Sequence, residues 1–554
     1  MKSPLYEVPS CKDGAVPTRT PSNLTSAHLD MGIDVDLRAT PTSGDRSQLW
    51  LTTIILVCVG IPTLLAAVTG SLAIPHNDAW SHSRIAKVFG TTGQIELVGW
   101  NRSALLGQII PLGPLGRWVL AQQLFVVVLA MVLLIVSYLF LKSHLGTRLA
   151  LFGTALVGTL PMFGLLATSF MADIPAATAF MLCVWLGDKA IRTRSIPLLI
   201  LATLSGIWGV TIREQTLAVL AAVLLIAFLK WKGRDKWLVV PVGMGAVVVV
   251  AAFEYWRQSL PLGDHLTTSF DAARFDRYLV EAVLTLALFL TPVALSISRP
   301  WHWSLAAWVL ALTTLGAGVV SGLKLNIGLL GNYLDPAGPY AVTQTGITVF
   351  IPALLWHGIL ACACISAALL VGTLITTPPR WDQFSGATIG FLTLGTVAQA
   401  AVGQDIFDRY LITFVPLILV GVLSTNRPSS NTAQRTISAI AIAGLLVFSL
   451  ATTAYGTARD AARWHAAQEL ADSGIPATDI DAGFEWVGWH SGQPKTAAPS
   501  ATGGWASAFS DTRACYTVAS SQLPAGEVIT THDYNTFVLF GDSTIWVQST
   551  GTCA

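Results

Sequence analysis

The chain has 554 residues, of which 53% are hydrophobic and only 11% charged, and its mean hydropathy is +0.61. Soluble domains carry about 25% charged residues, so this composition excludes a soluble globular protein and indicates a polytopic α-helical membrane protein. The net charge of +1 is spread over the loops without a basic stripe, which argues against nucleic-acid binding.

Residues 1–48 are mostly polar and predict a disordered cytoplasmic tail. Residues 49–456 predict a membrane domain, because about thirteen apolar stretches approach the roughly 20 residues that a helix needs to cross a bilayer. The predicted spans are 49–74, 119–141, 149–169, 173–189, 196–212, 216–230, 237–253, 278–298, 304–323, 347–375, 383–402, 410–424 and 436–456.

The loops between these spans alternate in charge. One set is basic, so by the positive-inside rule it is cytoplasmic, while the other set holds nearly all the acidic residues. The N-terminus is then predicted inside the cell, and an odd number of spans places the C-terminus outside. The basic set comprises Lys142 to Arg148, Lys189, Arg192, Arg194, Lys230, Lys232, Arg234, Lys236, Arg299, Arg380, Arg427 and Arg435. The acidic set comprises Asp78, Asp173, Glu214, Glu254, Asp264, Asp271, Asp276, Asp335, Asp405 and Asp408.

Two longer segments fall on the predicted outer side. The first outer loop, 75–118, is too long for a tight turn and contains the helix-like pieces SRIAKVFG and NRSALLGQI, so we expect it to have a function. Residues 457–554 predict a small extracytoplasmic α+β domain, with a helix in TARDAARWHAAQELADSG and strands in GEVITTH, NTFVLFGD and TIWVQS. If this domain is outside the cell, Cys515 and Cys553 could form one disulfide.

Two carboxylates stand out on the predicted outer face. Asp173 lies in an otherwise apolar stretch, where an ionised group costs at least about 2.5–3.5 kcal/mol at membrane depth, so it is a candidate for a functional role. Its position before Ile174 and Pro175 is also typical of a helix N-cap, and the two roles are compatible. Asp78, in the string IPHNDAWSH, is either a general base toward an acceptor hydroxyl or the N-cap of a helix beginning near Trp80.

Two arginines are candidates for binding a phosphate in two-point fashion on the same face. Arg213 either binds a phosphate or forms an ion pair with Glu214 or another outer acid. Arg409 likewise either binds a phosphate or forms an ion pair with Asp405 or Asp408. The predicted substrate-binding residues are Trp80, His82, Lys87, Arg213, Gln215, Arg409 and Tyr410. Lipid head groups would account for Lys87 equally well. His76, Asp78 and His82 lack the spacing of a metal site on a secure helix, so no metal ligands are predicted.

Several short strings, in this order along the chain, resemble those of a known family. An Asp in the first outer loop (NDAWSH) is followed by SFMADIP opening a later span, by the R-x-Q string at 213–215, and by RYLITFVP near the last helices. The segment IDAGFEWVGWHS at 480–491 resembles a phrase that follows the membrane region in many bacterial members. Over about residues 70–490 the chain thus resembles GT-C fold membrane glycosyltransferases, in the family related to protein O-mannosyltransferases and the lipid A aminoarabinose transferase.

The resemblance implies an inverting transferase in the bacterial plasma membrane. It would move a hexosyl or pentosyl group from a polyprenyl-phosphate-linked donor to a glycan, lipid or protein acceptor of the cell envelope, at the outer membrane face. The base role carries to Asp78, a site-shaping role to Asp173, and neutralisation of the departing lipid phosphate to Arg213 and Arg409. Ala79 follows Asp78 where the O-mannosyltransferases have an acidic pair, which sets this chain apart from them. Some members use a divalent cation, and no ligand cluster in this sequence demands one.

Two other functions fit the same composition. A secondary transporter or lipid-linked sugar flippase would use intramembrane acids as proton or substrate sites. The long first outer loop, the absence of evident repeats and the clustering of acids at one face argue against it. A catalytically inactive relative whose C-terminal domain binds cell-wall glycan is a third interpretation.

Overall fold

The computed structural model describes residues 43–99, 106–261, 270–324, 327–428, 431–494, 504–537 and 541–551. The chain divides into two compact units, Met1–Arg46 and Ser47–Ala554, and the second holds the membrane helices together with the C-terminal sheet. Most of the predicted tail, residues 1–42, lies outside the described residues, and the first described helix already begins at Ser43.

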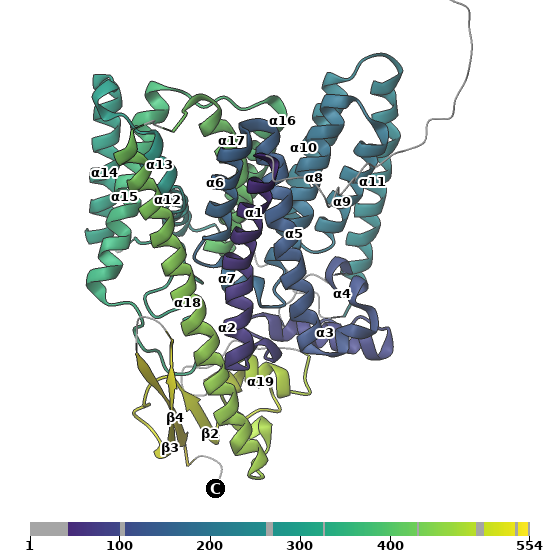
Figure 1. Ribbon diagram of the computed structural model, residues 1–554. Helices are drawn as coiled ribbons and strands as arrows, with labels where there is room; N and C mark the ends of the chain where they lie inside the picture. The colour runs from purple at the N-terminus through teal and green to yellow at the C-terminus, as the bar shows by residue number, and fades with distance from the viewer. Residues whose placement is uncertain are drawn as a thin grey trace, which may run out of the picture. The chain divides into compact units, whose positions relative to one another are not determined.

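Helices dominate the second unit, which confirms the predicted polytopic helical membrane protein (Figure 1). In the described part of the chain, eight helices are long and apolar enough to cross a membrane, or nine if one bent pair is a single span. Each predicted span falls on a helix, although α6, α9 and α10 are shorter than a full crossing. The helices are α1 (Ser43–Ile55), α2 (Ile61–Thr69), α5 (Val119–Leu145), α6 (Thr147–Gly158), α7 (Phe163–Ala167), α8 (Asp173–Thr193), α9 (Ile196–Val210), α10 (Leu217–Lys230), α11 (Gly233–Ser259), α12 (Ala272–Phe289), α13 (Thr291–Ile297), α14 (Leu305–Lys324), α15 (Ala353–Thr376), α16 (Gln383–Ala401), α17 (Phe414–Thr425) and α18 (Thr432–Asp472).

Prolines interrupt three of the predicted spans. The span at 149–169 is split into α6 and α7 around Pro161, and the span at 278–298 bends by 65° between α12 and α13, beside Pro292. Proline lacks the N–H that continues a helix ladder and its ring clashes with the preceding turn, which explains both breaks. The third interrupted span is the one predicted at 347–375. Its first six residues are irregular, and α15 begins only after Pro352.

The first outer loop folds back against the end of the bundle. It holds α3 (Ala79–Thr92), α4 (Leu106–Leu112) and a 3₁₀ segment at Gly113–Arg117, while residues 100–105 lie outside the described residues. Figure 1 shows α3 and α4 at the same end of the bundle as α19 (Phe484–His490) and the sheet. The loop is therefore an ordered structural layer over most of its described length.

The C-terminal sheet has four strands in the order β1-β2-β4-β3, and only the β1–β2 pair is parallel. The strands are β1 (Ile480–Asp481), β2 (Tyr516–Ala519), β3 (Glu527–Asn535) and β4 (Asp542–Ser549). Two of the three predicted strands are present. The described positions of NTFVLFGD after Asn535 instead belong to the turn between β3 and β4, where Phe537 has a φ of 68°.

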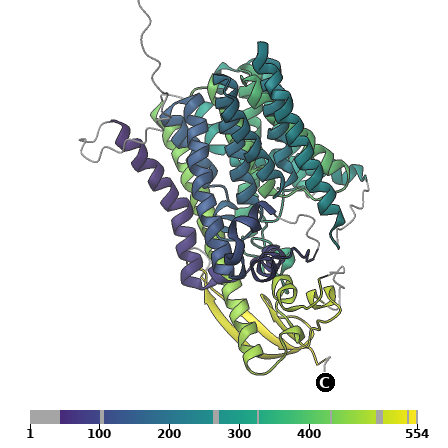
Figure 2. The ribbon, with the colours of Figure 1, turned by 90° about the vertical axis from the view of Figure 1, so that its right-hand side faces the viewer.

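The helix predicted to start at 457 is a continuation of the last membrane helix. α18 runs for 41 residues without a break, so the predicted domain boundary at 456/457 falls inside it. No glycine or proline that could end the helix occurs between Gly456 and Gly474. Figure 2 shows the lower part of α18 and the yellow sheet projecting together beyond the other helices. Cys515 is disulfide-bonded, and Cys553 lies outside the described residues.

Candidate functional site

Asp78 and Asp173, 95 positions apart in the sequence, contact the same arginine. Arg409 Nη2 lies 3.3 Å from Asp78 Oδ2, and Arg409 Nε lies 3.6 Å from Asp173 Oδ1. A second arginine completes the group, because Arg213 Nη1 lies 2.9 Å from Asp173 Oδ1. Two acids and two arginines from four separate segments thus meet in one cluster.

Local structure presents both acids at the starts of helices without using them as caps. Asp78 occupies the N-cap position of α3, yet its side chain makes no cap hydrogen bond. Asp173 is the first residue of α8, where the helix dipole favours an anion, and its side chain also caps nothing. Asn77, the residue before Asp78, has a left-handed backbone conformation with a φ of 48°, which asparagine tolerates better than most residues. Asp78 thus occupies the predicted N-cap position without a side-chain cap hydrogen bond, and its carboxylate contacts Arg409 of the cluster.

The two arginines come from short segments between helices. Arg213 lies in extended conformation between α9 and α10, with its guanidinium 4.6 Å from the centre of the Tyr410 ring. Arg409 lies in a 3₁₀ segment (Asp408–Thr413) that leads into α17, and it donates from Nη1 to Asn332 Oδ1 at 3.3 Å. The alternative that Arg213 pairs with another outer acid is present, as its contact with Asp173. Two other alternative partners pair elsewhere: Glu214 lies 3.5 Å from Arg257, and Asp405 pairs with Arg274.

Three members of the cluster, Asp173, Arg213 and Arg409, line a small cavity of about 10 Å³, and Asp78 lies outside its lining. Beside these charged groups, the lining contains apolar and small residues of α8 and of the 3₁₀ segment before α17. The lining residues are Asp173, Ala176, Ala177, Phe180, Arg213, Gln215, Thr216, Arg409, Ile412 and Thr413. The cavity thus combines fixed charges with an apolar wall, as a site for an amphipathic ligand requires.

Burial differs among the four charged groups in a way that separates their roles. The side chains of Asp173 and Arg409 are 1% and 3% exposed, whereas those of Arg213 and Asp78 are 18% and 22% exposed. Neither oxygen of Asp173 has a hydrogen-bond partner among the described residues, so the guanidinium groups hold it by charge alone. Asp173 and Arg409 form the buried base of the cluster, and Asp78 and Arg213 are its more exposed members.

The other predicted site residues divide into two groups. Gln215 and Tyr410 lie with the cluster, the first lining the cavity and the second beneath the Arg213 guanidinium. Trp80 is fully buried and packs edge-on against Phe484 and Phe509, at ring-centre distances of 5.0 and 5.8 Å. Lys87 is exposed, with its Nζ 5.0 Å from the Trp489 ring. Trp80 and Lys87 therefore hold α3 to the C-terminal region and do not line the cavity.

His82 lies one helical turn after Asp78 and is buried. Its Nδ1 is 3.2 Å from the Phe170 carbonyl oxygen, which fixes the ring beside the start of α8. Burial lowers the pKa of His82 to about 4, against the opposing effect of the nearby Asp78 carboxylate. The imidazole is therefore neutral at physiological pH and donates from Nδ1.

The carboxylates of the cluster do not fit a divalent cation. Both face guanidinium groups, so four formal charges already balance before any ligand binds. His76 is hydrogen-bonded outside the cluster, with its Nδ1 2.8 Å from Asp460 Oδ2. Within the described residues no group of three or more His, Cys, Asp or Glu side chains is arranged to hold a metal.

Three polar residues that support the cluster were not singled out as site residues from the sequence. Asn332 Oδ1 accepts from both Arg409 and Asn77, at 3.3 and 3.4 Å. Asp408 is fully buried and accepts the backbone N–H groups of Tyr333, Leu334 and Arg409. Asp460 of α18 contacts His76 and Tyr340. The charges of TARDAAR, in an alanine-rich helix, are the sequence feature that could have drawn attention to Asp460.

Comparisons with known proteins find only distant structural likeness. No family model matches the chain, and no curated protein matches it. The solved structure of ArnT from Cupriavidus metallidurans bound to undecaprenyl phosphate is 13% identical, covers 91% of this chain and 98% of that chain, and gives a TM-score of 0.43. The apo state of that protein is 12% identical, covers 90% and 98%, and gives a TM-score of 0.40. Similarity at this level carries no conclusion about activity.

Proposed function

We propose that this protein is an integral-membrane glycosyltransferase that moves a sugar from a polyprenyl-phosphate-linked donor to a cell-envelope acceptor, with inversion, at the outer face of the membrane. The observation that carries the proposal is the joint approach of Asp78 and Asp173 to Arg409, with Arg213 beside them. Such a donor already carries a good leaving group, so transfer needs a base, a phosphate-binding cation and an apolar slot rather than a nucleotide-binding domain.

Asp78 is proposed as the general base. Its Oδ2 accepts from Arg409, and its Oδ1 has no protein partner among the described residues, so it is free to accept a proton. The acceptor oxygen attacks the anomeric carbon from the side opposite the phosphate, its proton passes to Asp78, and the sugar–phosphate bond breaks. General-base assistance of this kind contributes about 10²–10⁴-fold to a rate.

Arg213 and Arg409 are proposed to stabilise the charge that develops on the departing lipid phosphate. Each guanidinium has five N–H donors, and the ion pairs with the carboxylates occupy only some of them. Asp173, buried between the two arginines, holds both in place before the donor arrives. Cations fixed in advance stabilise a developing charge without reorganisation during the reaction.

The charge pattern of the loops supports a site at the outer face of the membrane. Asp78, Arg213 and Arg409 lie in the acid-bearing set of connections, at the end of the bundle that carries the C-terminal sheet (Figure 1). The positive-inside rule assigns the opposite, basic end to the cytoplasm. Donor, acceptor and base would then meet at the outer surface.

Asp78→Asn tests the proposal. The amide keeps the size of the carboxylate but is no base, so we expect transfer from a polyprenyl-phosphate sugar to fall by about 10²-fold or more. Lipid and glycan analysis of a deletion strain, which reveals an accumulated donor or a missing sugar, identifies the substrates for this assay. Asp405→Asn is the matched control, because Asp405 also pairs with one arginine at this end of the bundle but lies outside the cluster.

Full transfer by the Asp78→Asn variant, in membranes with normal expression, would remove Asp78 from the mechanism. Uptake of a solute into proteoliposomes without transfer to any acceptor would instead support the transporter interpretation. Equal loss in both variants would show that pairing with arginine, rather than base chemistry, is what matters.

A further inference from the structure

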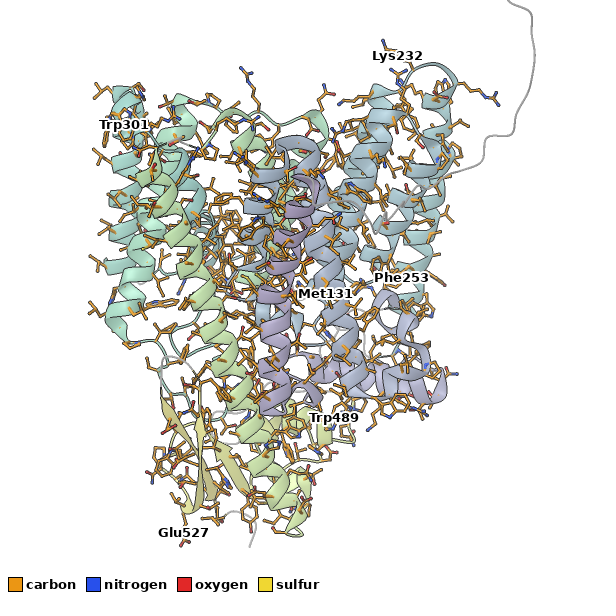
Figure 3. All side chains as sticks on the ribbon, viewed as in Figure 1. Met131, Lys232, Phe253, Trp301, Trp489 and Glu527 are labelled. Atoms are coloured by element: carbon orange, nitrogen blue, oxygen red, sulfur yellow. The ribbon has the colours of Figure 1, made fainter. Side chains whose placement is uncertain are left out.

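A second cavity lies at the opposite end of the membrane helices from the acid–arginine cluster. It has a volume of about 280 Å³, close to the lower end of the range of small-molecule sites, and we call it the basic cavity. Its lining residues are Ile297, Arg299, His302, Trp303, Thr373, Thr376, Thr377, Thr425, Asn426 and Arg427. Arg409 precedes α17 and Asn426 follows it, so the span of this helix separates the two sites. In Figure 3, Trp301, next to His302, marks this end, and Trp489 marks the other.

The charged side chains that line the basic cavity are all basic. Its lining includes two arginines and a histidine but neither Asp nor Glu. No ion pair joins Arg299 or Arg427 to any acid in the described part of the chain. By contrast, Arg192, another arginine of the predicted cytoplasmic loops, pairs with Asp188. The two arginines of the basic cavity are therefore available to an anion from outside the chain.

Hydrogen bonds between helix ends hold the walls of the basic cavity in place. Thr373 Oγ1 and Ser298 Oγ are 3.0 Å apart, which ties the end of α15 to the end of α13. Asn426 Nδ2 donates to the Thr377 carbonyl oxygen at 3.2 Å, which ties the end of α17 to the same wall. These bonds fix the helix ends that the two arginines follow, and guanidinium groups are well suited to bind phosphate oxygens in pairs.

One wall of the basic cavity is aromatic and adjoins a lipid-facing surface. Trp303 packs so closely on Gly372 that a Cβ there would lie 2.6 Å from the ring, and it contacts Trp308 edge-on at 5.0 Å. α14, which begins just after Trp303, exposes Leu305 and Leu312 at 82% and 58%. Tryptophan is typical of the membrane–water interface, where an apolar body meets a polar surface. A ligand reaching this cavity from the bilayer would have its chains against α14 and its head group inside.

We propose that the basic cavity binds the phosphate group of an anionic phospholipid, at the membrane face opposite the acid–arginine cluster. Arg299 and Arg427 bind the phosphate oxygens, the Thr377 hydroxyl supplies a neutral hydrogen bond, and Trp303 contacts the glycerol region. A soluble phosphate-bearing molecule has the same recognition chemistry, and the position beside exposed α14 favours the lipid. This binding is separate from the transfer reaction and does not depend on it.

The test measures binding of a fluorescent short-chain phosphatidylglycerol to the full-length protein in a neutral detergent. We expect the Arg299→Gln/Arg427→Gln double variant to bind this probe about 100-fold more weakly, since each of the two lost contacts to a charged group is worth at least about one order of magnitude. Arg380→Gln, an exposed arginine of the same predicted face outside the cavity, is the matched control and should bind within about twofold of the wild type.

Competitors identify the source of the phosphate. Unlabelled phosphatidylglycerol should displace the probe at far lower concentration than inorganic phosphate, and displacement by both at equal concentrations would overturn the lipid assignment. Wild-type affinity in the double variant, or equal losses in the double and control variants, would overturn the site itself. The melting temperature without lipid checks folding, and the two single variants, each at an exposed position, provide the same comparison if the double variant is unstable.

Discussion

At the scale of single residues, Arg409 holds the candidate site together. Its side chain is 3% exposed and contacts the carboxylates of Asp78 and Asp173 and the amide oxygen of Asn332. Arg213 contacts Asp173 from the more exposed side. The two arginines therefore differ in what their removal leaves behind, even though both carry the same charge.

Arg409→Ala is expected to destabilise the protein by about 3–5 kcal/mol, because it leaves a buried acid short of a partner. Arg213→Ala removes a partner from Asp173 but none from Asp78, so it should cost less stability than Arg409→Ala. It should also raise the KM for the lipid donor about tenfold or more, since this guanidinium faces the cavity. Melting temperature and transfer kinetics of both variants check these outcomes. The Arg409→Ala/Asp173→Asn double variant should recover part of the lost stability, and a strictly additive loss would contradict the pairing.

His82 gives the folded state an acid-sensitive component. Its folded-state pKa of about 4 lies below its ordinary value of 6.5, so the unfolded chain binds the proton more readily. Stability from this group is fully present above pH 6.5 and is lost as the pH falls toward 4, by up to about 1.4 kcal/mol per pH unit. His82→Gln should flatten the decline of melting temperature between pH 6.5 and 4, compared with the wild type. Parallel declines in the two proteins would show that His82 does not cause the loss.

At the scale of elements, close approach between helices depends on small residues. Gly187 of α8 is buried against α10, and a Cβ at this position would overlap the Val223 side chain. Gly245 of α11 has open space where its Cβ would lie. The two glycines thus test packing and helix propensity separately, because both are in the interiors of long apolar helices.

Gly187→Ala is expected to destabilise the protein by about 1–3 kcal/mol, the usual range for overpacking a well-filled interior. Gly245→Ala should leave the melting temperature unchanged or slightly raise it, since alanine favours the helix and meets no neighbour. Thermal unfolding in one detergent compares the pair. Equal effects would mean that the α8–α10 contact is looser than its geometry implies.

At the scale of the whole molecule, the first outer loop and the C-terminal region are joined around one side chain. Trp80 lies between Phe484 and Phe509, and a Cβ on Gly488 of α19 would lie 2.5 Å from its ring. Arg84 Nη1 adds a bond of 2.8 Å to the Gly488 carbonyl oxygen. Trp80 is two residues from Asp78, so this packing also fixes the proposed base.

Trp80→Ala is expected to cost about 3–5 kcal/mol in stability and to lower kcat by displacing α3. Trp80→Phe should keep most of the stability and most of kcat, because a smaller ring can still contact the two phenylalanines. Transfer kinetics with thermal unfolding separate this packing role from the substrate-binding role predicted from the sequence. A rise in KM at unchanged stability would favour the latter.

The spans, the membrane class and the placement of Asp78 and Asp173 on one face could be predicted from the sequence, because lipid dictates the length of apolar runs and the charge of the loops. Their contact through Arg409 could not. The position of Trp80 could not, since an aromatic residue beside a functional acid looks the same whether it packs or binds. The supporting roles of Asn332 and Asp408 could not be predicted from the sequence either. They act through contacts between segments about 75 residues apart, and no local pattern encodes those contacts.

Because α18 is unbroken, it fixes how far its C-terminal part lies from the membrane-spanning part and which way its side chains face. Its 41 residues, rising ~1.5 Å each, make a rod of roughly 60 Å, about twice the hydrocarbon thickness of a bilayer. Asp460 sits some 40 Å along that rod, where it contacts His76, two positions before Asp78. One extra residue inserted between the bilayer and Asp460 would turn this carboxylate by about 100° away from His76. Register along a single helix is therefore what aligns the membrane-embedded half of the protein with the half that projects from it.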